Sequence, residues 1–339
     1  MRVKARFLSP LVVPLFLALA AAWCAVAAPA PFVVYTYSSF GQELVDLIEK
    51  DFAKQVGLPV EVRTFSDTGP LFNQLLLEKK SPGADAVIGL DSLDLPKAVR
   101  FKLFAPYKPK ALAGIDGRFV FDRHYRLIPY DYGYVLFNYD SAKLKLVPRT
   151  HEDLARPEYK GLIVLENPKT SSPGRIFLLT TVALFGERGY LDYWRRLKPN
   201  LLTITPGWDE AYGMYTNGEA PIVLSYGTSP VYHLQNEGTE RYKALVLDGA
   251  AYAQIEGIGI VRGARHRKAA EALVEYVLSP AFQNAVPLSQ YMYPVARNAR
   301  LPESFRAAAK VGRLLHLDEK KVAARLDTWL SDWEAVMAQ

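Results

Sequence analysis

The segment FVVYTYSSFGQELVDLIEKDFAKQVGLPVEVRTF, residues 32–65, decides the fold class of this chain. It opens with a β-branched and aromatic run, continues with apolar residues at helical spacing, and closes with an alternating run that predicts a second strand. A helix-like stretch then begins at Leu71, and a buried-looking strand follows at Ala84–Leu90. This β-α-β-α-β order predicts a parallel sheet with helices on its faces.

Two further segments of the chain predict long strands, and a second α/β series lies between them. Leu127–Tyr139 is β-prone and a candidate for a crossing between lobes, and Tyr252–Val261 is the candidate return strand. The second series begins with the strand Leu162–Leu165. Near the C-terminus, Trp329 and Trp333 share one face of a helix, and we expect them in the core.

Composition bounds the class of protein. The chain has 339 residues, of which 50% are hydrophobic, so it can bury a large core and form two lobes. Of the net charge of +6, three basic residues lie within the first 30 residues, which contain no acid. The remaining balance is that of an ordinary soluble protein, and it does not indicate a nucleic-acid partner.

Residues 1–28 have the pattern of a secretory signal peptide. Arg2, Lys4 and Arg6 precede an apolar run that is shorter than the roughly 20 residues of a membrane-spanning helix, and small residues follow at Ala25–Ala28. Cys24, the only cysteine, lies within this segment. We therefore expect a cleaved leader, export to an oxidising compartment and a mature chain without a disulfide.

The segment Gly207–His233 combines aromatic rings with a short strand, Pro221–Ser225, that ends in the small polar run Tyr226–Pro230. In an open α/β sheet, ligands bind beyond the carboxyl ends of the strands. The stretch therefore predicts a pocket for a flat, cationic, partly polar small molecule. The alternative is that its rings belong to the core. These rings are Trp208, Tyr212, Tyr215, Tyr226 and Tyr232.

Two predicted helix starts suit an anion. Thr68 and Ser172 are small polar residues that precede Pro70 and Pro173, and proline is favoured in the first turn of a helix. Free N–H groups and the helix dipole at such a start favour phosphate or carboxylate. The alternative is that both residues only cap their helices. Ser39 and Gln42 are spaced as a capping box for the first helix.

Catalytic and metal-binding patterns are weak, and we predict neither a cofactor nor a metal. The five histidines have no metal-ligand spacing, and the chain has no nucleophile-elbow, Walker or Rossmann motif. Asp131, within the tyrosine-rich run Pro129–Tyr134, is either an acid among phenols or a hinge residue bonded to backbone amides. We favour the hinge interpretation.

Several motifs carry a family resemblance. The most specific are GWDEAYG at 207–213, LSYGTSP at 224–230 and MYPV at 292–295, supported by PYDYGY at 129–134 and NPKTSSPG at 167–174. Together with VYTY at 34–37, ADAVIGLD at 84–91 and SPAFQNA at 279–285, they cover almost the whole chain after the leader. In these motifs the chain resembles the periplasmic thiamine-binding proteins of bacterial ABC importers.

The resemblance implies a type II periplasmic-binding-protein fold, with two α/β lobes joined by a hinge and the ligand cleft between them. Lobe one would comprise residues 31–133 plus about 252–339, and lobe two about 134–251. The implied function is capture of thiamine and thiamine phosphates in the periplasm and delivery to a membrane permease and ATPase. Such a protein would be a monomer and not an enzyme.

The resemblance also implies a set of ligand-binding residues. Ser171 and Ser172 would meet the phosphate end, and Tyr232 and Tyr291 would face the rings. Where this chain has Tyr291 the family often has Trp, which leaves the preference among phosphate forms open. The full set is Tyr37, Asp67, Thr68, Ser171, Ser172, Trp208, Tyr226, Gly227, Thr228, Ser229, Tyr232 and Tyr291.

Other functions remain as alternatives. The same fold can bind a polyamine, an aminophosphonate or ferric iron, although the chain lacks the adjacent tyrosines typical of iron-binding relatives. A thiaminase-I-like enzyme would need a cysteine, and none follows the predicted leader. A sensor that docks on a membrane receptor would have the same sequence features as a transport protein.

Overall fold

The computed structural model describes residues 29–339, so the predicted signal peptide and Cys24 lie outside the described residues. The strands are β1 (Phe32–Tyr37), β2 (Val60–Phe65), β3 (Ala86–Asp91), β4 (Phe104–Ala105), β5 (Ile128–Asp140), β6 (Ile163–Glu166), β7 (Leu201–Thr205), β8 (Ile222–Tyr226), β9 (Tyr242–Leu245), β10 (Ala250–Val261), β11 (Tyr293–Pro294) and β12 (Arg313–Leu315). The α-helices are α1 (Gln42–Asp46), α2 (Ala53–Val56), α3 (Thr68–Leu77), α4 (Leu95–Arg100), α5 (His151–Leu154), α6 (Ser172–Leu197), α7 (Trp208–Thr216), α8 (Ser229–Glu237), α9 (Arg267–Val277), α10 (Pro280–Ser289) and α11 (Glu319–Ala338).

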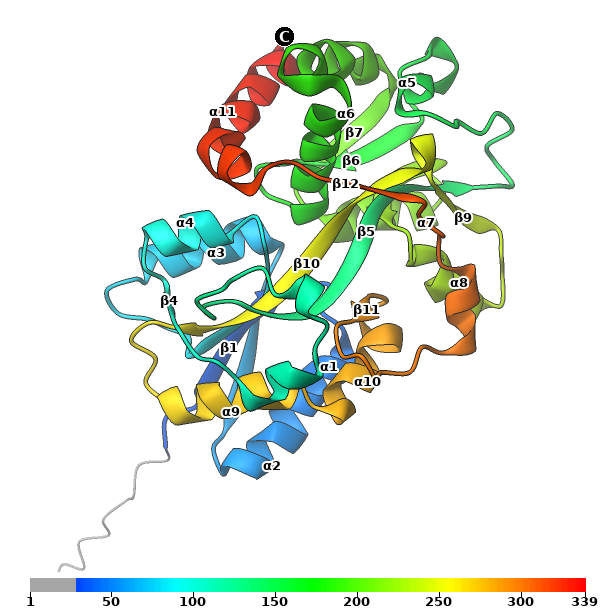
Figure 1. Ribbon diagram of the computed structural model, residues 1–339. Helices are drawn as coiled ribbons and strands as arrows, with labels where there is room; N and C mark the ends of the chain where they lie inside the picture. Colours follow the sequence, from blue (N-terminus) through cyan, green and yellow to red (C-terminus); the bar gives the residue numbers. More distant parts are fainter. Residues whose placement is uncertain (1–28) are drawn as a thin grey trace, which may run out of the picture. The chain divides into compact units, whose positions relative to one another are not determined.

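The strands form one mixed sheet in the order β2-β1-β3-β10-β5-β8-β6-β7, with the short strands at its margins. The parallel pairing predicted for the first series is confirmed between β1 and its neighbours β2 and β3, and the second half has the same pairing between β6 and its neighbours β7 and β8. Between these halves the long strands β10 and β5 pair antiparallel, and they run through the middle of the fold (Figure 1). The predicted crossing strands are therefore the ones that join the two halves.

The first half of the sheet is covered on both faces. Phe32 and Val34 of β1 pack into one apolar cluster with helices α1, α9 and α10, while Val33 and Tyr35 pack into another with α3. Alternate side chains of a strand point to opposite faces, so a strand covered on both sides is apolar throughout. All six residues of β1 are indeed buried, which explains why the sequence run has no polar alternation.

The second half repeats this arrangement. Ile163 and Leu165 of β6 pack with α6, and Val164 on the other face packs with α7. The C-terminal helix α11 lies against α6, and its Trp329 and Trp333 are buried in the same cluster, so their predicted place in the core is confirmed. Although the sequence-based boundaries assign α11 to lobe one, its core contacts are with the second half.

Two irregularities shape the middle of the sheet. Where β3 pairs with β10 the register skips Gly89, and where β5 pairs with β10 it skips Tyr130. Such bulges re-aim side chains, and here Tyr130 and its neighbour Asp131 both lie opposite the same stretch of β10. Gly89 has φ +102°, and a Cβ added there would lie 2.2 Å from Cε1 of Tyr37. The Tyr37 ring thus occupies the space that a side chain at residue 89 would need.

Gly89→Ala is expected to destabilise the protein by about 1–3 kcal/mol, because alanine both strains this backbone conformation and displaces the Tyr37 ring. Urea unfolding measures the loss. Gly117→Ala is the matched control, since Gly117 has no positive φ and nothing within 4 Å of the added Cβ. Equal stability of the two variants would contradict the packing role of Gly89.

The start of the first helix corrects one prediction. Its N-cap residue is Gly41, and no side chain caps it, so the predicted Ser39–Gln42 capping box is wrong. Two N–H groups of this turn donate instead to the end of α10 and the residue after it: Gly41 N to Oε1 of Gln290 at 2.8 Å, and Leu44 N, which also donates to the Gly41 carbonyl, to Oγ of Ser289 at 3.3 Å. The partners come from residues about 250 positions away, which no local pattern can reveal.

Candidate ligand-binding site

A cavity of about 370 Å³ lies where the two halves of the sheet meet. Its walls come from the ends of β1, β8 and α10, the middle of β10, the starts of helices α3, α6 and α8, one side of α7, and the segment that follows α10. The lining residues are Tyr37, Ser39, Asp67, Thr68, Ser172, Pro173, Trp208, Asp209, Tyr212, Gly213, Thr216, Tyr226, Ser229, Tyr232, Gln254, Glu256, Ser289, Gln290, Tyr291 and Met292.

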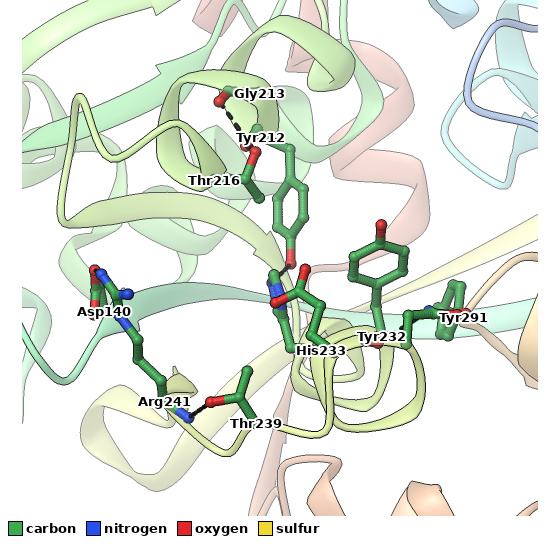
Figure 2. Close-up of polar contacts among 11 residues, drawn as sticks. Asp140, Tyr212, Gly213, Thr216, Tyr232, His233, Thr239, Arg241 and Tyr291 are labelled. Carbon is green, nitrogen blue, oxygen red and sulfur yellow. Dashed lines mark hydrogen bonds and ion pairs between the residues drawn. The ribbon is translucent and has the colours of Figure 1, made fainter.

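Aromatic rings form much of the lining. Trp208 and Tyr212 stack with ring centroids 4.7 Å apart, and Tyr232 meets Tyr291 edge to face at 5.2 Å. Figure 2 shows Tyr232 beside Tyr291 and the Tyr212 hydroxyl directed at His233, whose Nε2 lies 2.9 Å away. These contacts hold the rings in place, so flat faces are available to a ligand without reorganisation.

Four helices begin at the cavity. Thr68, Ser172, Trp208 and Ser229 are the first residues of α3, α6, α7 and α8, and each lines the cavity. The Oγ1 of Thr68 and the Oγ of Ser172 lie 2.9 Å apart, so these two hydroxyls hydrogen-bond each other rather than cap their helices. Free N–H groups at helix starts attract anions.

Asp67 links two of these helix starts. Its carboxylate accepts hydrogen bonds from the backbone N–H of Thr68 at 2.6 Å and of Trp208 at 3.2 Å, in opposite halves of the sheet. Burial raises the pKa of Asp67, and the two N–H donors oppose that rise. The carboxylate of Asp67 therefore uses N–H donors that an anionic ligand would otherwise bind, and it repels such a ligand.

Glu256 is a buried carboxylate of the cavity that accepts three side-chain hydrogen bonds. It is 3% exposed, and its Oε2 accepts from the hydroxyls of Tyr37 at 2.7 Å and Tyr130 at 2.6 Å. Its Oε1 accepts from Nε2 of Gln254 at 2.9 Å. Burial raises the pKa of Glu256 to about 8, while the two phenols favour the ionised form.

The structure corrects the prediction that Asp131 is a hinge residue bonded to backbone amides. Its side chain is completely buried, and neither oxygen has a hydrogen-bond partner, so it is not bonded to backbone amides. It pairs across strands with Glu256. Burial, and then the Glu256 charge, raise the pKa of Asp131 well above its ordinary value. The alternative interpretation, an acid among phenols, describes its position.

The charges of the lining are of one sign. Asp67, Asp209 and Glu256 are carboxylates, and the lining drawn from the described residues includes no lysine, arginine or histidine. The cavity combines carboxyl groups with aromatic faces, which is the environment that attracts an organic cation.

Nine of the twelve residues predicted from the sequence line the cavity: Tyr37, Asp67, Thr68, Ser172, Trp208, Tyr226, Ser229, Tyr232 and Tyr291. The other three, Ser171, Gly227 and Thr228, are buried and are not part of the lining. Gly227 donates its N–H to the carbonyl of Tyr134 at 2.8 Å, so this N–H fixes the backbone and is not available to a ligand.

The sequence interpretation did not name several lining residues, and some left a signal. Gln254 and Glu256 are polar residues inside an otherwise apolar strand, which is unusual enough to mark a site. Ser289 and Gln290 left none, because Ser289 ends helix α10 and Gln290 follows it, and the end of a helix carries no pattern that marks a site. Asp209 lies in the first turn of α7, where an acid is expected for helix stability alone.

Metal binding and membrane insertion find no support in the described part of the chain. Within residues 29–339, no three His, Cys, Asp or Glu side chains are grouped so that they could hold a metal ion. No helix of that region is long and apolar enough to cross a membrane.

Comparison with known proteins places the chain in a family. Residues 81–314 match the family described as bacterial extracellular solute-binding protein. The thiamine-binding periplasmic protein of Salmonella typhimurium is 34% identical over 309 residues, which cover 90% of this chain and 93% of the relative.

Solved structures agree with this placement. A structure described as periplasmic thiamin binding protein matches with a TM-score of 0.84 and 32% identity, over 91% of this chain and 96% of the other. The periplasmic binding protein AfuA from Actinobacillus pleuropneumoniae matches with a TM-score of 0.81 at 19% identity, over 92% and 99%, which shows the shared fold alone. The predicted type II periplasmic-binding-protein fold is thereby confirmed, and the chain belongs to the bacterial extracellular solute-binding protein family.

Proposed function

We propose that this protein captures thiamine in the periplasm and delivers it to the permease and ATPase of an ABC importer. The names of its relatives support thiamine as the ligand and the periplasm as the location. In this role it acts as a monomer.

The observation that carries the proposal is the lining of the cavity, in which aromatic faces and carboxylates occur without a basic side chain. Thiamine carries a permanent positive charge on its thiazolium ring, which no change of pH removes. An aromatic face attracts such a cation by about 0.5–2 kcal/mol, depending on how far water is excluded. In this proposal the stacked pair Trp208 and Tyr212 and the rings of Tyr232 and Tyr291 would supply these faces.

Thiamine phosphates are proposed as further ligands. Their tail would lie at the converging helix starts, where Thr68 and Ser172 offer hydroxyls. The carboxylate of Asp67 at the same place opposes a highly charged tail. We therefore infer that the monophosphate is accepted better than the diphosphate.

The two ends of the ligand can be separated by mutation. Ser172→Ala is expected to weaken thiamine monophosphate more than thiamine, because a hydrogen bond to a charged group contributes about 1.5–3 kcal/mol against about 1 for a neutral one. Tyr232→Ala should weaken both ligands by similar factors, since both carry the same rings. Dissociation constants of both ligands for both variants, at fixed pH and salt, test this. Equal losses in Ser172→Ala would remove the α6 start from the site.

Release without chemical change is part of the proposal. The family binds solutes for transport, and the described residues include no cysteine that could attack the thiamine bridge. After prolonged incubation with the protein, mass analysis should recover thiamine intact. Cleavage into pyrimidine and thiazole would identify an enzyme instead.

Closure of two lobes over the ligand is proposed as the working motion, with residues 31–133 plus about 252–339 in lobe one and about 134–251 in lobe two. Hydrogen bonds between these two groups of residues lie at the cavity, which supports this division. The Asp67 carboxylate accepts from the Trp208 N–H, and the Gly69 N–H donates to the carbonyl of Thr170 at 3.0 Å. Helix α11 is the exception to this division, because it packs against α6 and would move with lobe two although it lies within residues 252–339.

Calorimetric titration of the ligand-stripped protein tests the ligand directly. Thiamine is expected to bind much more tightly than spermidine, which shares its positive charge but lacks rings, and than aminoethylphosphonate, for which the lining offers no basic side chain. Tighter binding of spermidine would replace thiamine by a polyamine as the cargo. Tighter binding of aminoethylphosphonate would overturn the electrostatic argument itself.

A further inference from the structure

The floor of the cavity is a hydrogen-bond network that converges on Glu256. Gln290 Nε2 donates to the Tyr37 hydroxyl at 2.6 Å, and Tyr37 in turn donates to Glu256. From the other side, the Tyr226 hydroxyl donates to Oε1 of Gln254 at 2.9 Å, and Gln254 donates to Glu256. Every donor in these two chains points toward the carboxylate, so the network is built to hold a negative charge at this position.

Asp131 lies opposite Glu256 on the neighbouring strand β5. Directly opposed side chains in an antiparallel pair have Cβ atoms about 4.5–5.5 Å apart, and two buried carboxylates at that separation cannot both be ionised at neutral pH. Glu256 has three donors and Asp131 has none. Of the two carboxyls, Glu256 is therefore the one that ionises first, and Asp131 keeps its proton when it does.

The groups that face Glu256 are acids and phenols. They are Tyr37 from β1, Asp67 before α3, Asp91 from β3, Tyr130 and Asp131 from β5, and Tyr226 from β8. Of the acids, Asp91 has a cation nearby, Arg175, which also pairs with Asp94. Ionised Glu256 thus lacks a counter-ion within the described protein, although it lines a cavity that a ligand can enter.

We propose that Glu256 is the counter-ion of the positively charged ligand, and that the ligand displaces one proton from the Asp131–Glu256 pair when it binds. This inference rests on the proposed function, because it takes thiamine as the cation. The exchange is balanced: one positive charge enters the cavity, one proton leaves Glu256 for the solvent, and Asp131 retains its own proton.

The direction of the pH dependence follows. Burial holds the pKa of Glu256 near 8 in the ligand-free protein, and a cation beside it lowers that pKa. Below about pH 8 the ligand must therefore expel a proton. Its affinity consequently falls by up to about tenfold for each unit by which the pH is lowered. Above that pH the carboxylate is already ionised, and the affinity levels off.

Calorimetry on the full mature chain tests the proton directly and needs no variant. Thiamine is titrated into the wild-type protein from about pH 6 to about pH 9, in two buffers that differ in ionisation enthalpy. Near pH 7 we expect release of most of one proton per thiamine, seen as a heat difference between the buffers. We also expect an affinity that rises with pH and levels off near the pKa of Glu256. Binding without proton release at any pH would overturn the exchange.

Variants assign the proton to a residue. Glu256→Gln, which mimics the protonated form, should weaken thiamine at least tenfold at high pH and abolish the proton release. Asp131→Asn, which mimics protonated Asp131, should still release the proton when thiamine binds. If this variant releases no proton, the proton comes from Asp131 and the proposal is overturned. Glu219→Gln is the matched control, because Glu219 is exposed and outside the cavity lining.

The outcomes separate this inference from the proposed function. If the wild-type protein and Glu256→Gln bind thiamine equally well, the inference is overturned and the proposed function stands. Wild-type protein that binds no thiamine at any pH would overturn both.

Discussion

Replacing Arg175 by methionine is expected to destabilise the protein by about 3–5 kcal/mol, because it leaves buried carboxylates without a partner. Arg175 Nη1 donates to Oδ1 of Asp94 at 2.5 Å, and only 11% of the arginine side chain and 4% of the aspartate side chain are exposed. Asp91 lies beside them. Its burial and the Asp94 charge raise its pKa to about 6, whereas Arg175 lowers it. Urea unfolding of the two proteins measures the loss.

The double variant Arg175→Met, Asp94→Leu is the control for this prediction. Breaking a buried ion pair costs far more than replacing both partners by apolar groups, so the double variant should recover much of the lost stability. A single variant within about 1 kcal/mol of wild type would show that the two halves of the fold do not depend on this pair.

The ligand-free protein is expected to lose stability as the pH rises from about 4.5 to about 8. Burial raises the pKa of Glu166, Asp131 and Glu256, that of Glu256 to about 8. Over this window the folded state holds protons that the unfolded chain has already released, so the free energy of unfolding falls with pH. Each such group contributes up to about 1.4 kcal/mol per pH unit. Carboxyls with a lowered pKa, such as Asp140, act in the opposite direction but below about pH 4.

Glu166→Gln isolates one of these groups. Glu166 ends β6, is 1% exposed, and has no hydrogen-bond partner for either carboxylate oxygen. Denaturant unfolding at several pH values should give a shallower decline for this variant than for wild type. Glu219→Gln, on the surface, should keep the wild-type slope. A wild-type free energy of unfolding that rises through this window would contradict the burial of these carboxyls.

The fold class was readable from the sequence because it depends on local periodicity. The runs at Phe32–Tyr37 and Ala86–Asp91 are buried throughout and mostly apolar, as strands covered on both faces are, and helical spacing separates them. Much of the cavity lining was readable for a related reason. Asp67, Ser172, Trp208 and Tyr226 lie at strand ends and helix starts, where α/β sheets bind their ligands. The relation to thiamine-binding proteins came from motifs rather than from these patterns.

Only the tertiary structure decided which residues meet across the cavity. Gln290 reaches Tyr37 and the N–H of Gly41 because α10 packs on the first helix, a contact with no trace in local spacing. Asp131 looked like a hinge residue bonded to the backbone, yet the bulge at Tyr130 turns it toward Glu256 and leaves it without a donor. The sequence by itself determined the strands, the helices and the chemistry available at their ends. Which carboxylates are buried together, and therefore which of them holds a proton, depends on the register between β5 and β10, because the electrostatic interaction of two acids depends on their separation and burial and not on their distance in sequence.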